Sequence, residues 1–260
     1  MMKKYIFFDI DGTLTNANPG GTILPSTLRT LRKLEENGHF VAIATGRSYT
    51  MARTAMIETG ITNVVCCGGN GLVVDNKLLY IHPIEREKAL KIINELKEKK
   101  RVFGIKIDDS DNMYSYSQDF AEKVPEALKF SKVHYLGNDH YERIEEFHKI
   151  FVHYPIDTDE RIESLKETGM HYARYHSMSV VIEPDDKYKG ILDMIKMIGG
   201  KEEDIVVFGD GHNDLSMMKQ APMGIAMGNA IEELKQCATF VTKDCSENGI
   251  EYACEYFGWI

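Results

Sequence analysis

The stretch "KKYIFFDIDGTLT", residues 3–15, decides the fold and raises the main question of this sequence. Its apolar run Tyr5–Phe8 is typical of a buried strand, yet the run ends in two acids, Asp9 and Asp11, followed by Gly12. Aspartate before glycine is also a signal for a β-hairpin turn. The residues that follow, "TLTNANPGG", show no second strand pattern, so a hairpin is the weaker interpretation. The stretch therefore predicts a buried strand whose carboxyl end carries concentrated negative charge.

Strands and helices alternate after this first strand. Leucines at three-residue spacing, preceded by Pro25 and followed by Gly38, predict a helix over residues 26–37. The same alternation continues with a strand in "HFVAIAT", a helix over 48–59 and a strand in "TNVVCCGGNG". This order indicates parallel βαβ units. The next stretch, "GLVVDNKLLYI", predicts a hairpin with its turn at Asp75-Asn76.

The chain changes character near Pro83. Residues 84–100 predict a charged amphipathic helix, and the segment up to about 184 is rich in Tyr, His and Lys. The first pattern then returns, with helices expected at 189–198 and 213–220 around the strand "DIVVFGD", and short strands at "GIAM" and "TFVT". We therefore expect an α/β fold in which residues 1–82 and 185–260 form a Rossmann-like parallel-sheet core. An α/β cap domain, residues 83–184, is inserted into it.

The composition excludes several classes of protein. The chain has 260 residues with 31 basic and 40 acidic side chains, and its net charge of −9 argues against a nucleic-acid partner. The basic run Lys97–Arg101 is interpreted as the solvated end of a helix. Five cysteines without a CxxC pair are expected to be reduced thiols and not zinc ligands. No apolar run approaches the ~18 residues of a membrane span, so we expect a cytoplasmic protein; its oligomeric state stays open.

Polar residues follow the ends of several predicted strands. The stretches are Asp9–Thr13, Thr45-Gly46-Arg47 and "GDGHND" at Gly209–Asp214, and a further pair, Lys189-Gly190, opens a predicted helix. Each alone is a weak signal, because such residues are also common in plain turns and helix starts. In an open parallel sheet, however, ligands bind outside the carboxyl ends of the strands. The combination therefore predicts one shared site.

Four carboxylates would meet at that site: Asp9, Asp11, Asp210 and Asp214. Like charges this close are unfavourable unless a cation lies between them. Oxygen ligands without thiolate or imidazole favour Mg²⁺ over Zn²⁺. Thr45, Lys189 and the loop amides would then supply donors for an anion, and phosphate is the simplest choice.

With these motifs the chain resembles the phosphatases of the haloacid dehalogenase (HAD) superfamily, and more closely their Cof-like subfamily, subclass IIB, which has a C2-type cap. The resemblance covers nearly the whole chain. Its motifs, in order, are "DIDGTL", "ATGR", "KGILDMI" and "FGDGHNDLSMM" followed by "GIAMGNA". The first and last are specific, and the middle two gain weight from their order and spacing.

The resemblance implies a Mg²⁺-dependent phosphatase acting on small phosphorylated metabolites, with sugar phosphates as the expected class. Asp9 would be the nucleophile that forms an aspartyl-phosphate, and Asp11 the general acid and base. The other roles that the resemblance implies are phosphoryl binding by Thr45 and Gly46, loop support by Thr13, charge neutralisation by Lys189, metal binding by Asp9, Asp11, Asp210 and Asp214, and orientation of water or substrate by Asn213 and Asp214.

Several alternatives remain open at this point. Arg47 could reach the substrate or pair with a core carboxylate. A phosphomutase shares the same motifs, and a regulatory module that stores phosphate on Asp9 would use the same nucleophile. The family usually shows Asn-Gly-Ala where this chain has Asn70-Gly71-Leu72, and the loop over residues 16–22 is unusually rich in glycine. Both departures concern the mouth of the site and therefore leave the substrate open.

Overall fold

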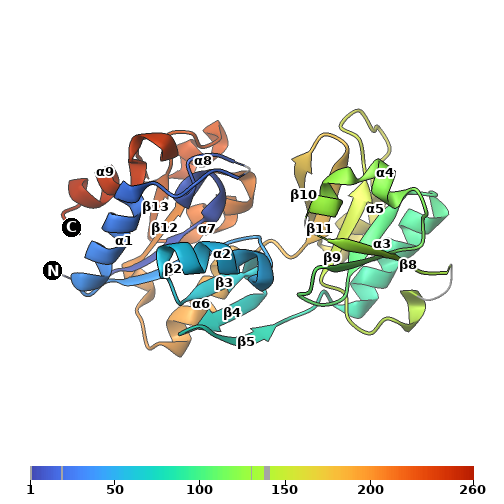
Figure 1. Ribbon diagram of the computed structural model, residues 1–260, viewed down its shortest axis with the longest axis horizontal. Helices are drawn as coiled ribbons and strands as arrows, with labels where there is room; N and C mark the ends of the chain where they lie inside the picture. Colours follow the sequence, from blue (N-terminus) through green and yellow to red (C-terminus); the bar gives the residue numbers. More distant parts are fainter. Residues whose placement is uncertain (1, 19, 130, 138–140) are drawn as a thin grey trace. The chain divides into compact units, whose positions relative to one another are not determined.

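The computed structural model describes residues 2–18, 20–129, 131–137 and 141–260, which divide into two compact units. Residues 1–81 and 185–260 make up the first, called the core unit here, and residues 82–184 make up the second, called the cap unit. Each unit has its own sheet and its own apolar core (Figure 1). Within the described residues, every helix is too short or too polar to cross a bilayer.

The core unit is built on an eight-stranded sheet in the order β14-β13-β12-β1-β2-β3-β4-β5. The first six of these strands are parallel to one another, and β4 and β5 form an antiparallel hairpin at the edge. The bounds are β1 Tyr5–Phe8, β2 Phe40–Ala44, β3 Val64–Cys66, β4 Gly71–Val74, β5 Lys77–Ile81, β12 Ile205–Gly209, β13 Met223–Ala226 and β14 Phe240–Val241. The expectation of a parallel-sheet α/β core is confirmed.

Helices cover both faces of this sheet, because the side chains of its buried strands alternate between two apolar clusters. In β1, Ile6 and Phe8 belong to the cluster that contains side chains of α1, α2 and α9, whereas Tyr5 and Phe7 belong to the one with α6, α7 and α8. The helix bounds are α1 Pro25–Glu36, α2 Tyr49–Thr59, α6 Lys187–Met197, α7 Leu215–Gln220, α8 Glu232–Cys237 and α9 Gly249–Tyr256. The central strands are thus buried on both sides, which fixes their carboxyl ends rigidly.

Helix α6 begins two residues earlier than the sequence pattern predicts. Its N-cap is Asp186, whose side chain accepts a hydrogen bond from the backbone amide of Lys189 at 3.1 Å. A capping aspartate fixes the first turn of a helix because it satisfies an amide that has no partner within the helix. Lys187 is therefore the first residue of the helix and Lys189 the third.

The cap unit has a six-stranded sheet in the order β10-β11-β9-β6-β7-β8, antiparallel except for the pair β7 and β8. One face packs against α3 and α5, and part of the other packs against α4. The bounds are α3 Arg86–Glu98, β6 Phe103–Lys106, β7 Asn112–Ser115, α4 Phe120–Lys123, β8 Lys132–Tyr135, β9 Lys149–His153, α5 Glu163–Thr168, β10 His171–His176 and β11 Ser179–Glu183.

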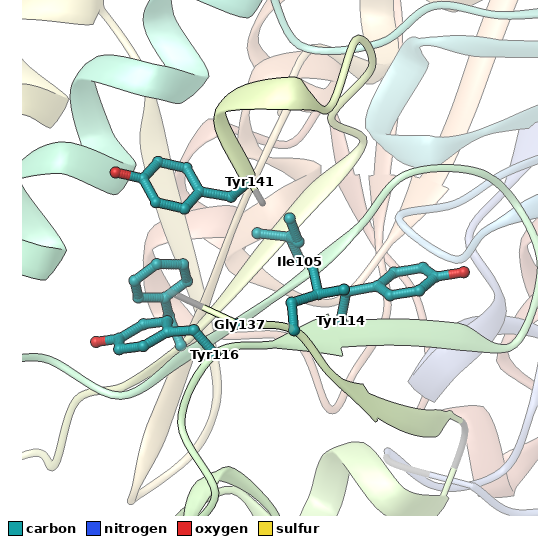
Figure 2. Close-up of a pocket in the computed structure, with 7 residues that line it drawn as sticks. Ile105, Tyr114, Tyr116, Gly137 and Tyr141 are labelled. Atoms are coloured by element: carbon teal, nitrogen blue, oxygen red, sulfur yellow. The ribbon is translucent and has the colours of Figure 1, made fainter. Parts of the chain in front are cut away.

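Figure 2 shows a small hollow of the cap unit that is lined by aromatic rings, among them Tyr114, Tyr116 and Tyr141. The hydroxyl groups of two of these rings are engaged outside the hollow. Tyr116 donates to the carbonyl of Arg101 at 2.6 Å, and the Tyr141 oxygen accepts from Lys97 Nζ at 2.8 Å. The hollow is therefore lined mainly by ring and aliphatic surface, as expected of packing within the cap unit.

Candidate active site

The site is built at the carboxyl ends of two adjacent central strands. Strands β1 and β12 are parallel, with Phe8 opposite Phe208, and these two rings stack with centroids 4.7 Å apart. The next residue, Asp9, donates its backbone amide to the Phe208 carbonyl at 3.1 Å. Asp210 follows directly after β12. The pairing of the strands therefore brings two acids that are 201 residues apart in sequence to the same edge of the sheet.

A tight turn after β1 carries the rest of the first motif and depends on a glycine. Gly12 has a φ of +72°, and a Cβ at this position would lie only 2.3 Å from Asp210 Oδ2. A side chain is excluded both by the left-handed backbone and by the approach of the carboxylate. Thr13 Oγ1 donates to Asp210 Oδ1 at 3.3 Å, so the turn also helps to position Asp210, the acid that follows β12.

Three buried carboxylates gather here: Asp9, Asp210 and Asp214 each offer an oxygen, and these atoms lie within 4.8 Å of one another. Burial raises the pKa of Asp9 to about 8, although Lys187 opposes this and the charge of Asp214 adds to it. Burial and the Asp214 charge likewise raise the pKa of Asp210 to about 6. Carboxylates held this close resist ionisation together, which is the condition that a bound cation relieves.

The side chain of Asp11 lies outside this cluster. Its two oxygens accept a bidentate pair of hydrogen bonds from Arg47, at 2.8 Å from Nε and 2.6 Å from NH2. Burial lowers the pKa of Arg47, but the hydrogen bonds and charge of Asp11, together with the charge of Asp9, raise it above its usual value. The structure thus brings together three of the four predicted carboxylates. Arg47 pairs with a carboxylate, which is one of the two alternatives that the sequence left open for this residue.

The buried cation of the site is Lys187 and not Lys189, which corrects the sequence analysis. Lys187 is fully buried, and its Nζ lies 2.6 Å from both Asp9 Oδ1 and Asp214 Oδ1. Burial alone would lower the pKa of Lys187, but these two carboxylates raise it. The Lys189 side chain is 58% exposed and forms an ion pair with Asp193 at 2.8 Å. Residues two apart on a helix point in different directions, so only one of the two lysines can face the site.

Asp214 uses both of its carboxylate oxygens. Oδ1 accepts a hydrogen bond from Lys187 Nζ, and Oδ2 accepts hydrogen bonds from the backbone amides of Asp210 at 2.9 Å and Gly211 at 3.0 Å. These contacts close the "GDGHND" turn, in which Asn213 lies half-buried with its side-chain oxygen beside Gly211. The turn is a short 3₁₀ segment, so α7 starts at Leu215 and not at residue 213 as expected. Asp214 therefore fixes the position of the lysine and of the Asp210 loop at once.

The second motif lies at the end of β2, the neighbour of β1 on its other side. Thr45 is buried and its backbone amide donates to the Val65 carbonyl at 2.9 Å. The Thr45 hydroxyl accepts the amide of Arg47 at 3.1 Å. Gly46 lies between them in the same turn. The structure therefore places Thr45, Gly46 and Arg47 at the same edge of the sheet as Asp9.

The sequence did not identify two asparagines that form hydrogen bonds at the site. Asn18 Nδ2 donates to Asp210 Oδ2 at 3.2 Å and lies 3.5 Å from the Asp11 carbonyl. Asn229 Nδ2 donates to the Gly12 carbonyl at 2.8 Å, while its oxygen accepts the Cys245 amide at 2.9 Å. Only Asn229 could have been found from the sequence, because it lies within "GIAMGNA", part of the last family motif. The contacts of Asn18 come from a loop that no periodic pattern describes.

Comparison with known proteins gives a consistent result. A family model described as haloacid dehalogenase-like hydrolase matches residues 6–253. YkrA of Bacillus subtilis, provisionally named a phosphatase, is 32% identical over 99% of both chains. YitU of the same organism, a 5-amino-6-(5-phospho-D-ribitylamino)uracil phosphatase, is 27% identical over 98% of both. Among solved structures, the HAD subclass IIB sugar phosphatase BT4131 is similar with a TM-score of 0.80, 25% identity, and coverage of 99% of this chain and 100% of the other.

Proposed function

Because the chain belongs to the haloacid dehalogenase-like hydrolases and its curated relatives are phosphatases, we propose that it hydrolyses phosphate monoesters of small metabolites, sugar phosphates in particular, through an aspartyl-phosphate on Asp9. It is a phosphoric monoester hydrolase by family. One observation carries the finer proposal: the buried Asp9 carboxylate is held by Lys187 within a cluster of three acids at the end of β1.

The reaction proceeds in two steps. The Asp9 carboxylate attacks phosphorus, and the bond between phosphorus and the leaving oxygen breaks as Asp11 gives that oxygen a proton. Water then attacks the aspartyl-phosphate, Asp11 takes a proton from it, and inorganic phosphate leaves with Asp9 restored. Two residues thus divide one difficult displacement into two easier ones. Arg47 orients the Asp11 carboxylate by its two hydrogen bonds.

The three-acid cluster fits Mg²⁺, since it offers hard oxygen ligands without a thiolate or an imidazole. Asp9, Asp210 and the backbone carbonyl of Asp11 would hold the ion, with Asp214 beside them. When bound, Mg²⁺ supplies positive charge that favours the ionised form of Asp9 and stabilises negative charge on the phosphoryl group. Thr45, the Gly46 amide and Lys187 would donate to the remaining phosphoryl oxygens.

The first test is a phosphate-release screen over sugar phosphates, nucleotides and cofactor phosphates, with and without Mg²⁺. Release of inorganic phosphate is expected for several small monoesters. A phosphomutase would instead return an isomeric sugar phosphate without free phosphate. A regulatory phospho-acceptor would show a long-lived acyl-phosphate, detectable by intact mass. The presence of Asp11 two residues after the nucleophile favours rapid hydrolysis.

Removal of a metal ligand is expected to raise the Mg²⁺ requirement. We expect chelation with EDTA to abolish turnover and Mg²⁺ to restore it. Asp210→Asn should raise the Mg²⁺ concentration for half-maximal activity at least about 100-fold, because it removes a charged ligand. Calorimetric titration of Mg²⁺ into the same variant should show the same loss of affinity. Asp193→Asn, which alters a partly exposed acid paired with Lys189, is the matched control. Full activity in excess EDTA would rule out the metal.

Replacing the acid/base residue is expected to affect substrates according to their leaving group. Asp11→Asn should slow sugar phosphates by about 10²- to 10⁴-fold, because a sugar alkoxide needs a proton to depart. The effect on p-nitrophenyl phosphate should be smaller in the first step, since p-nitrophenolate leaves without one. Single-turnover measurement of p-nitrophenol release isolates that step. Equal losses on both substrates would argue against the role of Asp11 as acid.

A further inference from the structure

One side chain of the loop over residues 16–22 contacts two of the groups that would hold the metal ion. Asn18 Nδ2 lies 3.2 Å from Asp210 Oδ2 and 3.5 Å from the backbone carbonyl oxygen of Asp11. These two oxygens belong to the separate turns that follow β12 and β1. The amide of Asn18 therefore bridges both turns, although Asn18 itself is exposed to solvent.

The shape of this loop directs Asn18 back toward the acids. The carbonyl of the preceding residue, Ala17, accepts the Gly12 amide at 3.2 Å and the Thr15 hydroxyl at 2.9 Å. Further along the loop, Gly21 has a φ of +86°, and a Cβ there would lie only 2.8 Å from the Ala17 nitrogen. This glycine permits the loop to fold back on itself. The position of Asn18 thus follows from backbone contacts that tie the loop to the first motif.

The distances of Asn18 Nδ2 are those of a neighbouring ligand and not those of an ion. Mg²⁺ binds oxygen octahedrally at about 2.0–2.1 Å, so that adjacent ligand atoms lie about 3.0 Å apart. At 3.2 and 3.5 Å from the two oxygens, Nδ2 is too distant to stand in the place of the ion. It lies close to the spacing of an adjacent ligand. The side chain therefore already reaches the coordination shell.

The atom at this position is suited to the metal-free state. An amide nitrogen donates hydrogen bonds, whereas the amide oxygen of the same group accepts them and can bind a metal. A donor favours the two oxygens as long as no cation lies between them, and the charge of a bound cation reverses this preference. Half a turn of the terminal amide exchanges nitrogen and oxygen. Because Asn18 is exposed, water can then accept a hydrogen bond from its nitrogen.

We propose that Asn18 is a further ligand of the Mg²⁺ ion, which it binds through its side-chain oxygen after this rotation. The inference rests on the proposed function and deepens it, because the ion is then held by the glycine-rich loop as well as by the ends of β1 and β12. A neutral oxygen suits a cluster that already contains three carboxylates, since it adds no like charge. Binding of the ion also fixes the loop.

Titration calorimetry of Mg²⁺ into the substrate-free protein tests this ligand without turnover. Asn18→Ala should weaken Mg²⁺ binding about 10-fold, because water replaces the lost ligand only in part. Asn18→Asp should bind Mg²⁺ at least as tightly as the wild-type protein, because a carboxylate supplies the same oxygen with a charge. In EDTA, Asn18→Asp should melt below the wild-type protein, since it adds another acid to the site, and excess Mg²⁺ should remove this difference.

A matched control is Thr22→Ala, which changes an exposed residue of the same loop whose hydrogen bonds with Asn16 are formed by its backbone. This control should keep the wild-type affinity for Mg²⁺. Unchanged binding by Asn18→Ala would overturn the ligand. Tighter binding would also overturn it, and would show that Asn18 only covers the site until the ion arrives.

A crystal structure of the Mg²⁺ complex gives a direct check. It should place Asn18 Oδ1 about 2.1 Å from the ion. A water molecule between the two would overturn the ligand. Each of these contrary results leaves the proposed function intact, whereas a wild-type protein that binds no Mg²⁺ and releases no phosphate would overturn the proposed function itself.

Discussion

Asp9→Asn is expected to lower phosphate release at least about 10⁴-fold, because the amide lacks the charge and the nucleophilic oxygen of the carboxylate. The shape of the side chain is kept, and the amide oxygen can still accept the hydrogen bond from Lys187. Burial already raises the pKa of Asp9 to about 8, so the substitution removes a charge that the fold does not favour. The melting temperature should therefore change little. Steady-state phosphate release and thermal unfolding of the same preparation check both parts.

The control for this variant is Asp75→Asn, at the turn between β4 and β5. Asp75 has a φ of +49°, a conformation that asparagine tolerates well. Its activity and stability should equal those of the wild-type protein. Retention of a tenth or more of the wild-type kcat by purified Asp9→Asn would show that another residue is the nucleophile. Intact mass after a rapid quench with substrate should detect a phosphoryl adduct on wild type and none on the variant.

The second large effect distinguishes the two lysines at the start of α6. Lys187→Met should lower kcat/KM about 10²- to 10³-fold, because it removes a positive charge held 2.6 Å from Asp9, the proposed nucleophile. It should also destabilise the fold by about 3–5 kcal/mol, since Asp9 and Asp214 lose their buried partner. Lys189→Met removes only an exposed ion pair, and it should stay within about 0.5 kcal/mol and twofold of wild type.

Activity of the Lys187→Met variant must be measured well below its melting temperature, so that loss of folded protein does not imitate loss of chemistry. The variant Lys187→Arg keeps the charge and separates the two effects, since it should recover stability more than activity. The opposite result, an inactive Lys189→Met beside an active Lys187→Met, would restore the assignment made from the sequence. Equal and full activity of both would remove the buried lysine from the mechanism.

The sequence was sufficient for the central part of the site because that part follows from strand order. Asp9 and Asp210 each come directly after a fully apolar strand, and buried parallel strands end at one edge of the sheet. No contact needs to be known to bring these residues together. The same reasoning places Thr45 after β2. These are features that a continuous apolar run and its interruption by polar residues can reveal.

The lysine could not be assigned in the same way. Two lysines stand two residues apart at the start of one helix, and each helical residue rotates the side chain by about 100°. Which of them faces the site depends on where the helix begins, and that is set by the Asp186 cap. The hydrogen bonds between Arg47 and Asp11 and the contacts of Asn18 could not be predicted from the sequence either. They join turns whose shape only the folded chain defines.

The central position of β1 has a consequence for the order in which the protein is made. This strand leaves the ribosome 200 residues before its partner β12, because Tyr5 lies opposite Ile205. At about 5–20 residues per second, one edge of this apolar strand stays open for roughly 10–40 s. An open apolar edge invites pairing with other chains. An early shield for this edge would therefore favour correct folding, and Asp9 and Asp210 can meet only after β12 has been made.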